Sequence, residues 1–350
     1  MTLEVQVTDL PGALVPATGV GAVSLNVTAT NAGQNGFVTA TPCISNGESS
    51  SLNFPSGTDR ANLVILPVSA RGTVCFSSST PVDIVVDVNG WFRADAGFVP
   101  VTPTRVFDTR QGTPAALRAV AKQLVGPLTP LRLKLTDLPG GLVPASGVGA
   151  VSLNVTATGS SAAGFVTVTA CGPVGEVSNV NFQANTDVAN AVLTPVSRAG
   201  EVCFVSNVDV HVVVDVNGWL KMPSGFTPVT PTRVFDTRPG TPAALRAVTK
   251  QQVGPTSPLK VRLADLLGGI VPASGVGAVS LTVTATGSAQ RGFVTVTPCG
   301  PVGEASSVNF QAGTATANAV LTPLSSAGEV CFTADRPVDV VVDVSGWFAS

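Results

Sequence analysis

The side chains that could do chemistry are few, and most of them recur at a fixed interval. The chain of 350 residues holds one histidine and no tyrosine. Three similar segments carry an acid, an amide or hydroxyl, and an indole at alternate positions, which share one face of a strand. Such a face could bind a sugar, because the polar groups would hydrogen-bond to hydroxyls and the indole would stack on the ring. The residues of this predicted ligand face are Asp87, Asn89, Trp91, Asp215, Asn217, Trp219, Asp343, Ser345 and Trp347.

The same residues also have a structural interpretation. Asp87 and its two equivalents could pair with an arginine or with loop amides inside the fold, and the tryptophan after each glycine could belong to the core. Arg105, Asp108 and Arg110 recur 128 positions later in the same order. This triplet favours a local ion pair, with an anion site as the alternative.

The single histidine argues against catalysis. His211 stands where the other two segments have Asp83 and Asp339, so no catalytic histidine recurs. No Gly-x-Ser-x-Gly nucleophile motif accompanies it, and a glycosidase would need two positioned carboxylates in each site. We therefore expect no enzyme, no cofactor and no metal site.

Six cysteines form three pairs with constant spacing. The members of each pair are 32 residues apart, and the repeat makes pairing within each copy the simplest of the possible connectivities. The predicted disulfides are Cys43 with Cys75, Cys171 with Cys203, and Cys299 with Cys331. Six buried thiols are the alternative, but no cysteine is left over, which favours an oxidising compartment and an extracellular or cell-surface protein.

The composition excludes several partners. Lys and Arg total 19 against 21 for Asp and Glu, a net charge of -2, which gives no attraction to nucleic acid or to anionic membranes. Mean hydropathy is +0.40, yet every apolar stretch ends long before the length that a membrane span requires. We expect neither a nucleic-acid partner nor a membrane span.

An internal repeat organises the chain. The string GVGAVSLNVTAT occupies residues 19–30 and 147–158, and GVGAVSLTVTAT occupies 275–286, so the period is 128 residues. Apolar residues alternate with polar ones in most segments, a pattern typical of strands. The expected fold is all-β, with three tandem β-sandwich domains of the jelly-roll kind. Residues 113–126 are the exception, where the spacing predicts a short helix or, as the alternative, an extended segment.

One repeat copy is incomplete. The string TPTRVFDTR occurs only twice, at residues 102–110 and 230–238. If it opens each unit, the first copy lacks its opening third; if it closes each unit, the last copy is the short one. In the first case copy one exposes an unpaired strand edge or an uncovered apolar face, and is the least stable copy and the main site of self-association.

These segments together resemble a known module. TPTRVFDTR, AVSLNVTAT, VNF followed by ANAVLTPVSRAGEVCF, and a closing VVVDVNGW with an aromatic residue are similar to the tandem module of secreted and surface proteins in actinobacteria and related Gram-positive lineages. In that family the TPTR segment opens the unit, which implies copies at 1–92, 93–220 and 221–350, the first truncated. The closing aromatic residue, often tyrosine there, is tryptophan here. The resemblance implies an accessory or stalk domain without catalysis.

The first functional hypothesis is therefore a non-enzymatic extracellular rod of repeats, serving as a self-assembling surface fibre, stalk or matrix component. Low charge would permit close lateral packing with copies of itself or with neighbouring surface proteins. The alternative is a multivalent carbohydrate-binding or adhesion module, in which weak glycan sites gain avidity by repetition.

Overall fold

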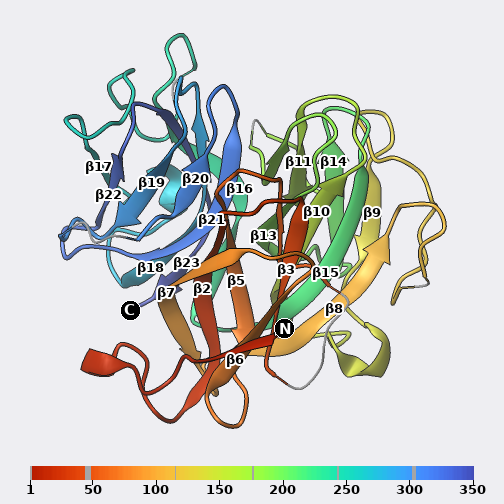
Figure 1. Ribbon diagram of the computed structural model, residues 1–350. Helices are drawn as coiled ribbons and strands as arrows, with labels where there is room; N and C mark the ends of the chain where they lie inside the picture. Colours follow the sequence, from red (N-terminus) through yellow and green to blue (C-terminus); the bar gives the residue numbers. More distant parts are fainter. Residues whose placement is uncertain (1, 44–48, 115, 176, 243, 302–304) are drawn as a thin grey trace.

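The predicted all-β class is confirmed. The computed structural model describes residues 2–43, 49–114, 116–175, 177–242, 244–301 and 305–350. Its regular elements are strands and three short 3-10 turns (Figure 1). The strands are β1 (Thr2–Gln6), β2 (Val20–Thr30), β3 (Gly36–Thr41), β4 (Leu52–Phe54), β5 (Arg60–Pro67), β6 (Thr73–Ser78), β7 (Asp83–Arg93), β8 (Phe98–Asp108), β9 (Leu131–Lys134), β10 (Val148–Thr158), β11 (Gly164–Thr169), β12 (Val180–Phe182), β13 (Val188–Pro195), β14 (Glu201–Ser206), β15 (His211–Lys221), β16 (Phe226–Asp236), β17 (Leu259–Arg262), β18 (Val276–Thr286), β19 (Gly292–Thr297), β20 (Val308–Phe310), β21 (Thr316–Pro323), β22 (Glu329–Ala334) and β23 (Asp339–Ala349).

The strands form six small sheets, two from each repeat. The second repeat contributes sheets with the strand orders β13-β10-β15-β8 and β12-β11-β14-β9. The third repeat contributes the equivalent orders β21-β18-β23-β16 and β20-β19-β22-β17. In the first repeat one sheet has only three strands, β5-β2-β7. The opening strand of the repeat, represented by β8 and β16, therefore has no counterpart beside β7 among the described residues.

A hydrophobic cluster lies between the two sheets of each repeat. Alternation along β10 turns Val151, Leu153 and Val155 into the cluster of the second repeat, where all three are fully buried. The opening strand adds Phe107, whose ring meets Phe204 edge-on at 5.1 Å between centroids. The cluster of the first repeat contains no residue from such a strand.

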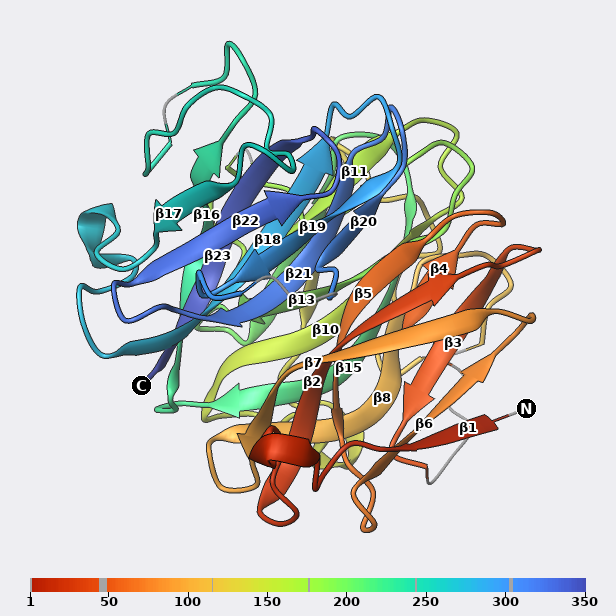
Figure 2. The ribbon, with the colours of Figure 1, turned by 60° about the vertical axis from the view of Figure 1, so that its left-hand side comes forward.

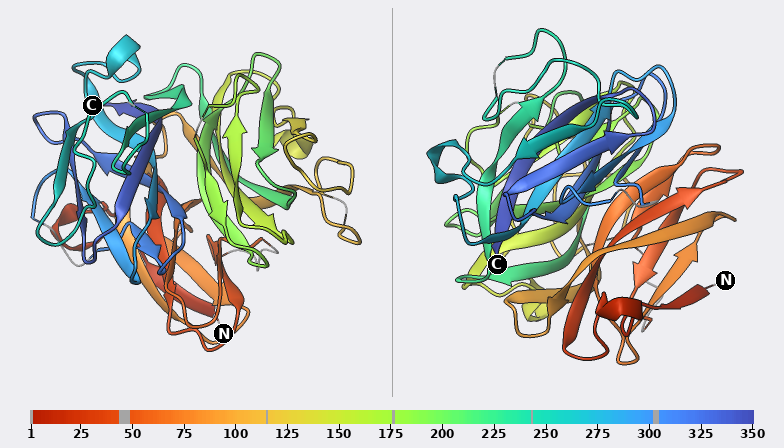
Figure 3. Two further views of the ribbon diagram at one scale, coloured as in Figure 1. Left: turned by 90° about the horizontal axis from the view of Figure 1, so that it is seen from above. Right: turned by 90° about the vertical axis from the view of Figure 1, so that its left-hand side faces the viewer.

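The three repeats lie side by side around a common centre instead of forming a rod (Figures 2 and 3). Strands β5, β13 and β21 contact one another there. Three equivalent asparagines close a ring of hydrogen bonds. The N–H of Ala191 donates to Asn62 Oδ1 at 2.9 Å, that of Ala319 to Asn190 Oδ1 at 3.1 Å, and that of Leu63 to Asn318 Oδ1 at 3.0 Å. The expectation of a rod was wrong because buried polar groups join the repeats laterally.

A fourth hydrophobic cluster fills the space between the repeats. It combines residues from all three copies, among them Leu63 and Ile65, Leu193 and Leu220, and Ala319. These side chains point away from the cluster inside their own repeat, since neighbouring strand residues alternate between faces. The three sheets that contain β5, β13 and β21 thus pack against a hydrophobic cluster on both faces.

The predicted helix at residues 113–126 is absent from the described part of that segment, and residue 115 lies outside it. Residues 116–126 form turns and end in an isolated bridge from Val125 to Val210. Side chains hold the segment in place of helical hydrogen bonds: Lys122 Nζ donates to the carbonyl of Asp108 at 2.7 Å, and Arg118 donates to the carbonyl of Asp137 at 2.6 Å. The alternative of an extended segment is closer to the structure.

Three disulfides join Cys43 to Cys75, Cys171 to Cys203, and Cys299 to Cys331, the pairing that the constant spacing predicts. The first cysteine of each pair lies two residues after β3, β11 or β19, and the second lies on the strand paired with it, β6, β14 or β22. Within the described residues, none of the helical segments has the length and apolarity needed to cross a membrane.

Candidate functional site

A buried carboxylate on the last strand of repeats two and three is paired with an arginine from the opening strand. Arg105 Nε lies 2.5 Å from Asp215 Oδ1, and Arg233 Nε lies 2.5 Å from Asp343 Oδ1. Both carboxylates are about 98% buried or more. The structural interpretation of these two aspartates is the one that the geometry supports.

Strand register explains the pairing. In the antiparallel ladders, Asp215 lies opposite Arg105 and Asp343 lies opposite Arg233. Burial raises the pKa of Asp343 to about 6 although Arg233 acts in the opposite direction. Burial likewise raises the pKa of Asp215 against the influence of Arg105. Desolvation of a carboxylate thus outweighs its ion pair at both positions.

The recurring triplet forms the predicted local ion pair. Arg110 donates two hydrogen bonds to the carboxylate of Asp108, the shorter at 2.7 Å. Arg105 Nη1 is 3.4 Å from the same carboxylate. Burial works to raise the pKa of Asp108, but the hydrogen bonds from Arg110 outweigh it and lower that pKa. Because Asp108 engages both arginines, the anion-site alternative gains no support.

The predicted ligand face is not assembled. Each last strand carries a bulge: Leu25 pairs with Val88 and Ser24 with Gly90, which leaves Asn89 as an extra residue. A bulge reverses the alternation beyond it. Trp91 therefore packs against the cluster inside its own repeat, on the opposite face from Asp87.

The same correction holds in the other repeats, where Asn217 and Ser345 are the extra residues and Trp219 and Trp347 pack against the cores. Asn217 and Ser345 are themselves buried. The expectation that aspartate, amide or hydroxyl, and indole share an exposed face was wrong because it assumed unbroken alternation. His211 contacts Thr109 through Nδ1 at 3.2 Å, and burial lowers the pKa of its imidazole.

Asp87 differs from its two equivalents. It lies opposite Asn26 in the ladder between β2 and β7, and its other flank has no strand among the described residues. In that part of the chain Oδ2 of Asp87 has no hydrogen-bond partner, as is also true of Oδ2 of Asp215, but Oδ1 of Asp215 is paired with Arg105. Burial raises the pKa of this carboxylate. The first repeat thus keeps the acid, but no arginine among the described residues pairs with it.

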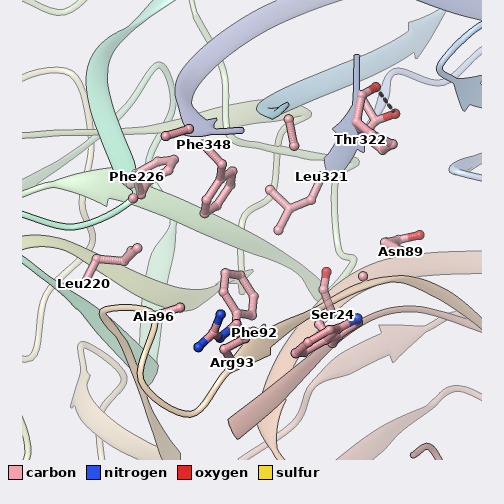
Figure 4. A pocket seen from close by; sticks show the side chains of 16 residues that line it. Ser24, Asn89, Phe92, Arg93, Ala96, Leu220, Phe226, Leu321, Thr322 and Phe348 are labelled. Carbon is pink, nitrogen blue, oxygen red and sulfur yellow. Dashed lines mark hydrogen bonds between the residues drawn. The ribbon is translucent and has the colours of Figure 1, made fainter. Parts of the chain in front are cut away.

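A cavity of about 380 Å³ opens beside Gly90 on the same strand. Phe92 lines it from the first repeat, and Leu321 and Phe348 line it from the third (Figure 4). Trp91 of the first repeat also contributes to the lining. Most of its lining is apolar, while Ser24, whose Oγ has no hydrogen-bond partner among the described residues, adds a polar group.

The equivalent positions in the other repeats are filled by phenylalanines. A Cβ at Gly218 would overlap the ring of Phe98, and one at Gly346 would overlap the ring of Phe226. A Cβ at Gly90 would meet nothing within 4 Å. The glycine on the last strand therefore leaves space for a phenylalanine ring in repeats two and three. The equivalent space beside Gly90 in the first repeat is empty among the described residues.

Sequence reasoning did not single out Gly90, Phe98 or Phe226. A signal existed, because both opening strands begin with phenylalanine seven residues before the arginine. Within the residues described, there is no cluster of three or more His, Cys, Asp or Glu side chains that could hold a metal ion.

No protein-family model and no curated protein matches the chain. Among solved structures, one described as the atomic structure of Sulfolobus Turreted Icosahedral Virus is 10% identical, with a TM-score of 0.22, over 99% of this chain and 82% of the other. A second, described as the triple jelly roll fold and turret assembly in an archaeal virus, is 12% identical, with a TM-score of 0.24, over 98% and 82%. Scores this low carry no argument about fold or function.

Proposed function

We propose that the chain is a non-enzymatic, self-assembling structural protein of the extracellular space or cell surface, of the repeat type that its motifs resemble. In this proposal each copy is a β-sandwich domain, with bounds at 1–92, 93–220 and 221–350. The observation that carries the assembling role is the open edge of β7, since unpaired strand edges recruit other chains.

Two further observations support a structural role. The carboxylates that could have served a ligand are engaged with arginines inside the fold in repeats two and three. One disulfide crosslinks each repeat internally, and a closed ring of asparagine hydrogen bonds joins the three repeats. Disulfides persist in oxidising compartments, which favours an extracellular location.

The assembling role is tested by sedimentation velocity and electron microscopy of the purified chain over a wide concentration range. We expect concentration-dependent oligomers or filaments, which disappear when a proline replaces Ile84, because the N–H of its equivalent Val212 faces the strand that covers β15. A strictly monomeric chain at high concentration would contradict it. The compartment is tested by non-reducing peptide mapping of the protein recovered from its native source, where free thiols would contradict an extracellular location.

Carbohydrate binding stays a prediction. The nine residues of the predicted ligand face do not form a site for it. A glycan array probed with the intact chain would test it. A signal that survives replacement of Trp91, Trp219 and Trp347 would place any glycan site elsewhere.

A further inference from the structure

In repeats two and three, one type of strand covers the last strand of the repeat. Strands β8 and β16 share the pattern Phe-x6-Arg-Val-Phe-Asp, which begins at Phe98 and Phe226. Each strand is anchored twice outside its backbone ladder: the first phenylalanine lies over a glycine, and the arginine pairs with a buried aspartate.

The first repeat presents the matching acceptor for each of these anchors. The cavity beside Gly90 corresponds to the places that Phe98 and Phe226 fill. The Asp87 carboxylate corresponds to Asp215 and Asp343, but within the described ranges it pairs with no arginine. Both Gly90 and Asp87 lie on β7, and in the described structure no strand pairs with the outer edge of β7.

We propose that β7, the cavity beside Gly90 and the Asp87 carboxylate form an acceptor site for a strand of the Phe-x6-Arg-Val-Phe-Asp type, supplied by another polypeptide that carries the same repeat. The two strands of this type within the 350 residues already pair with β15 and β23, so neither is free to move. Recognition combines added main-chain hydrogen bonds with two side-chain pockets, as in other cases of strand addition. This inference deepens the assembling role proposed above by naming its surface and partner.

The segments that connect one repeat to the next indicate the position and direction of the incoming strand. The N–H of Ala94 donates to the carbonyl of Gly19, that of Met222 to Gly147, and that of Ser350 to Gly275. Four residues after Ala94 and Met222 come the phenylalanines that fill the glycine pockets. The incoming phenylalanine accordingly lies beside Phe348 and the strand runs antiparallel to β7, as β8 runs to β15.

The binding test uses the intact chain and a labelled peptide with the sequence of residues 94–110. Fluorescence anisotropy should show saturable one-to-one binding, and hydrogen exchange should show protection of residues 83–93. Peptides carrying Phe98→Ala or Arg105→Ala should each bind at least tenfold more weakly. Absence of binding, or equal binding of all three peptides, would overturn the proposal.

Two protein variants give matched controls. Gly90→Val has room in the free protein but should block the incoming ring, so it should lower affinity at least tenfold with unchanged melting. Asp87→Arg should reject the natural peptide and bind the peptide carrying Arg105→Asp, because the charges are exchanged. The proposal is overturned if Asp87→Arg does not prefer the peptide carrying Arg105→Asp and Gly90→Val binds the natural peptide with unchanged affinity. The peptide would then bind at another surface.

A fusion separates the possible outcomes. Appending the sequence of residues 94–110 after Ser350 repeats the geometry of the two existing links and should raise the melting temperature, protect β7 and exclude the free peptide. If sedimentation instead shows that two copies pair through β7 and the peptide cannot compete, a second copy is the occupant and the proposal is wrong. Peptide binding by a chain that forms no assemblies would support this inference and contradict the assembling role.

Discussion

Arg105 donates from Nε to Oδ1 of Asp215 at 2.5 Å and thereby ties the opening strand of the second repeat to its last strand, 110 positions later. Arg233 and Asp343 repeat this pair. Asp87 has the same place in the first repeat, where no arginine in the described part of the chain pairs with it, so the structure contains both a paired and an unpaired version of this contact.

This internal comparison predicts opposite effects for one substitution at two positions. Asp215→Asn should lower the free energy of unfolding by about 1 to 2 kcal/mol, because Arg105 loses its closer carboxylate partner and keeps only the contact with Asp108 at 3.4 Å. Asp87→Asn should be neutral or stabilising, since it removes a carboxylate that is partly buried without one. Calorimetry of both variants checks this, and equal losses would contradict it.

The glycines of the last strands give a steric counterpart. Gly218→Ala should cost about 1 to 3 kcal/mol, because the new methyl group would overlap the ring of Phe98. Gly90→Ala should cost little, because the same methyl group meets only open space. Gly346→Ala, which faces Phe226, should follow Gly218→Ala; chemical denaturation ranks the three, and a costly Gly90→Ala would mean that the cavity is already filled in solution.

Asp343 predicts a pH dependence with a definite sign. Burial raises its pKa in the folded protein to about 6 from 3.8, although Arg233 and the N–H of Ser178 act to lower it and Asp236 adds to the rise. The folded state therefore binds more protons than the unfolded state between these values, and stability gains from this residue as the pH falls through the folded pKa. Relative to Asp343→Asn, the protein should gain about 1 kcal/mol between pH 7 and 5. A relative loss over that range would show that the ion pair outweighs burial.

The regular pattern allowed most of the strands to be predicted, along with the cysteine pairs, because alternation over the long strands and a constant 128-residue period are local signals. An unpaired edge in the first copy was one of two outcomes expected if TPTRVFDTR opens each unit, and the structure shows that edge at β7. The face occupied by Trp91 did not follow, since the extra residue at Asn89 becomes visible only when β7 is paired with β2.

The closed arrangement of the repeats could not be read from the sequence for a different reason. Asn62, Asn190 and Asn318 look like ordinary mid-strand polar residues until the three copies are brought together. The pattern of strands determines each sheet, whereas lateral packing depends on which outward faces complement one another in three dimensions.

One irregularity in this ring offers a gain in stability. Asn62 Nδ2 donates to Asn154 Oδ1 at 3.0 Å, and Asn318 Nδ2 to Asn26 Oδ1 at 2.9 Å, but the third copy has Thr282 at the position that corresponds to Asn26 and Asn154. Thr282→Asn should restore the missing hydrogen bond and stabilise the protein by about 1 kcal/mol.

The reverse change, Asn154→Thr, is the matched control and should destabilise it, since Asn154 also donates to the carbonyl of Ser50 at 2.7 Å. Thermal unfolding of both variants measures the difference. A destabilising Thr282→Asn alongside a harmless Asn154→Thr would show that these contacts between repeats do not hold the ring together.

Hydrogen exchange should distinguish the three last strands although their sequences are nearly the same. Strands β15 and β23 are paired on both sides, whereas β7 is paired only with β2 in the described structure. Amides of residues 83–93 should therefore exchange at least about tenfold faster than those of 211–221 and 339–349, because an edge strand opens without breaking a second ladder. The comparison needs a protein concentration at which sedimentation shows a monomer, since an added strand or a second copy would protect the edge. Uniform protection of all three segments in the monomer would mean that β7 is covered within the chain itself, and the first repeat would then have no free edge to offer a partner.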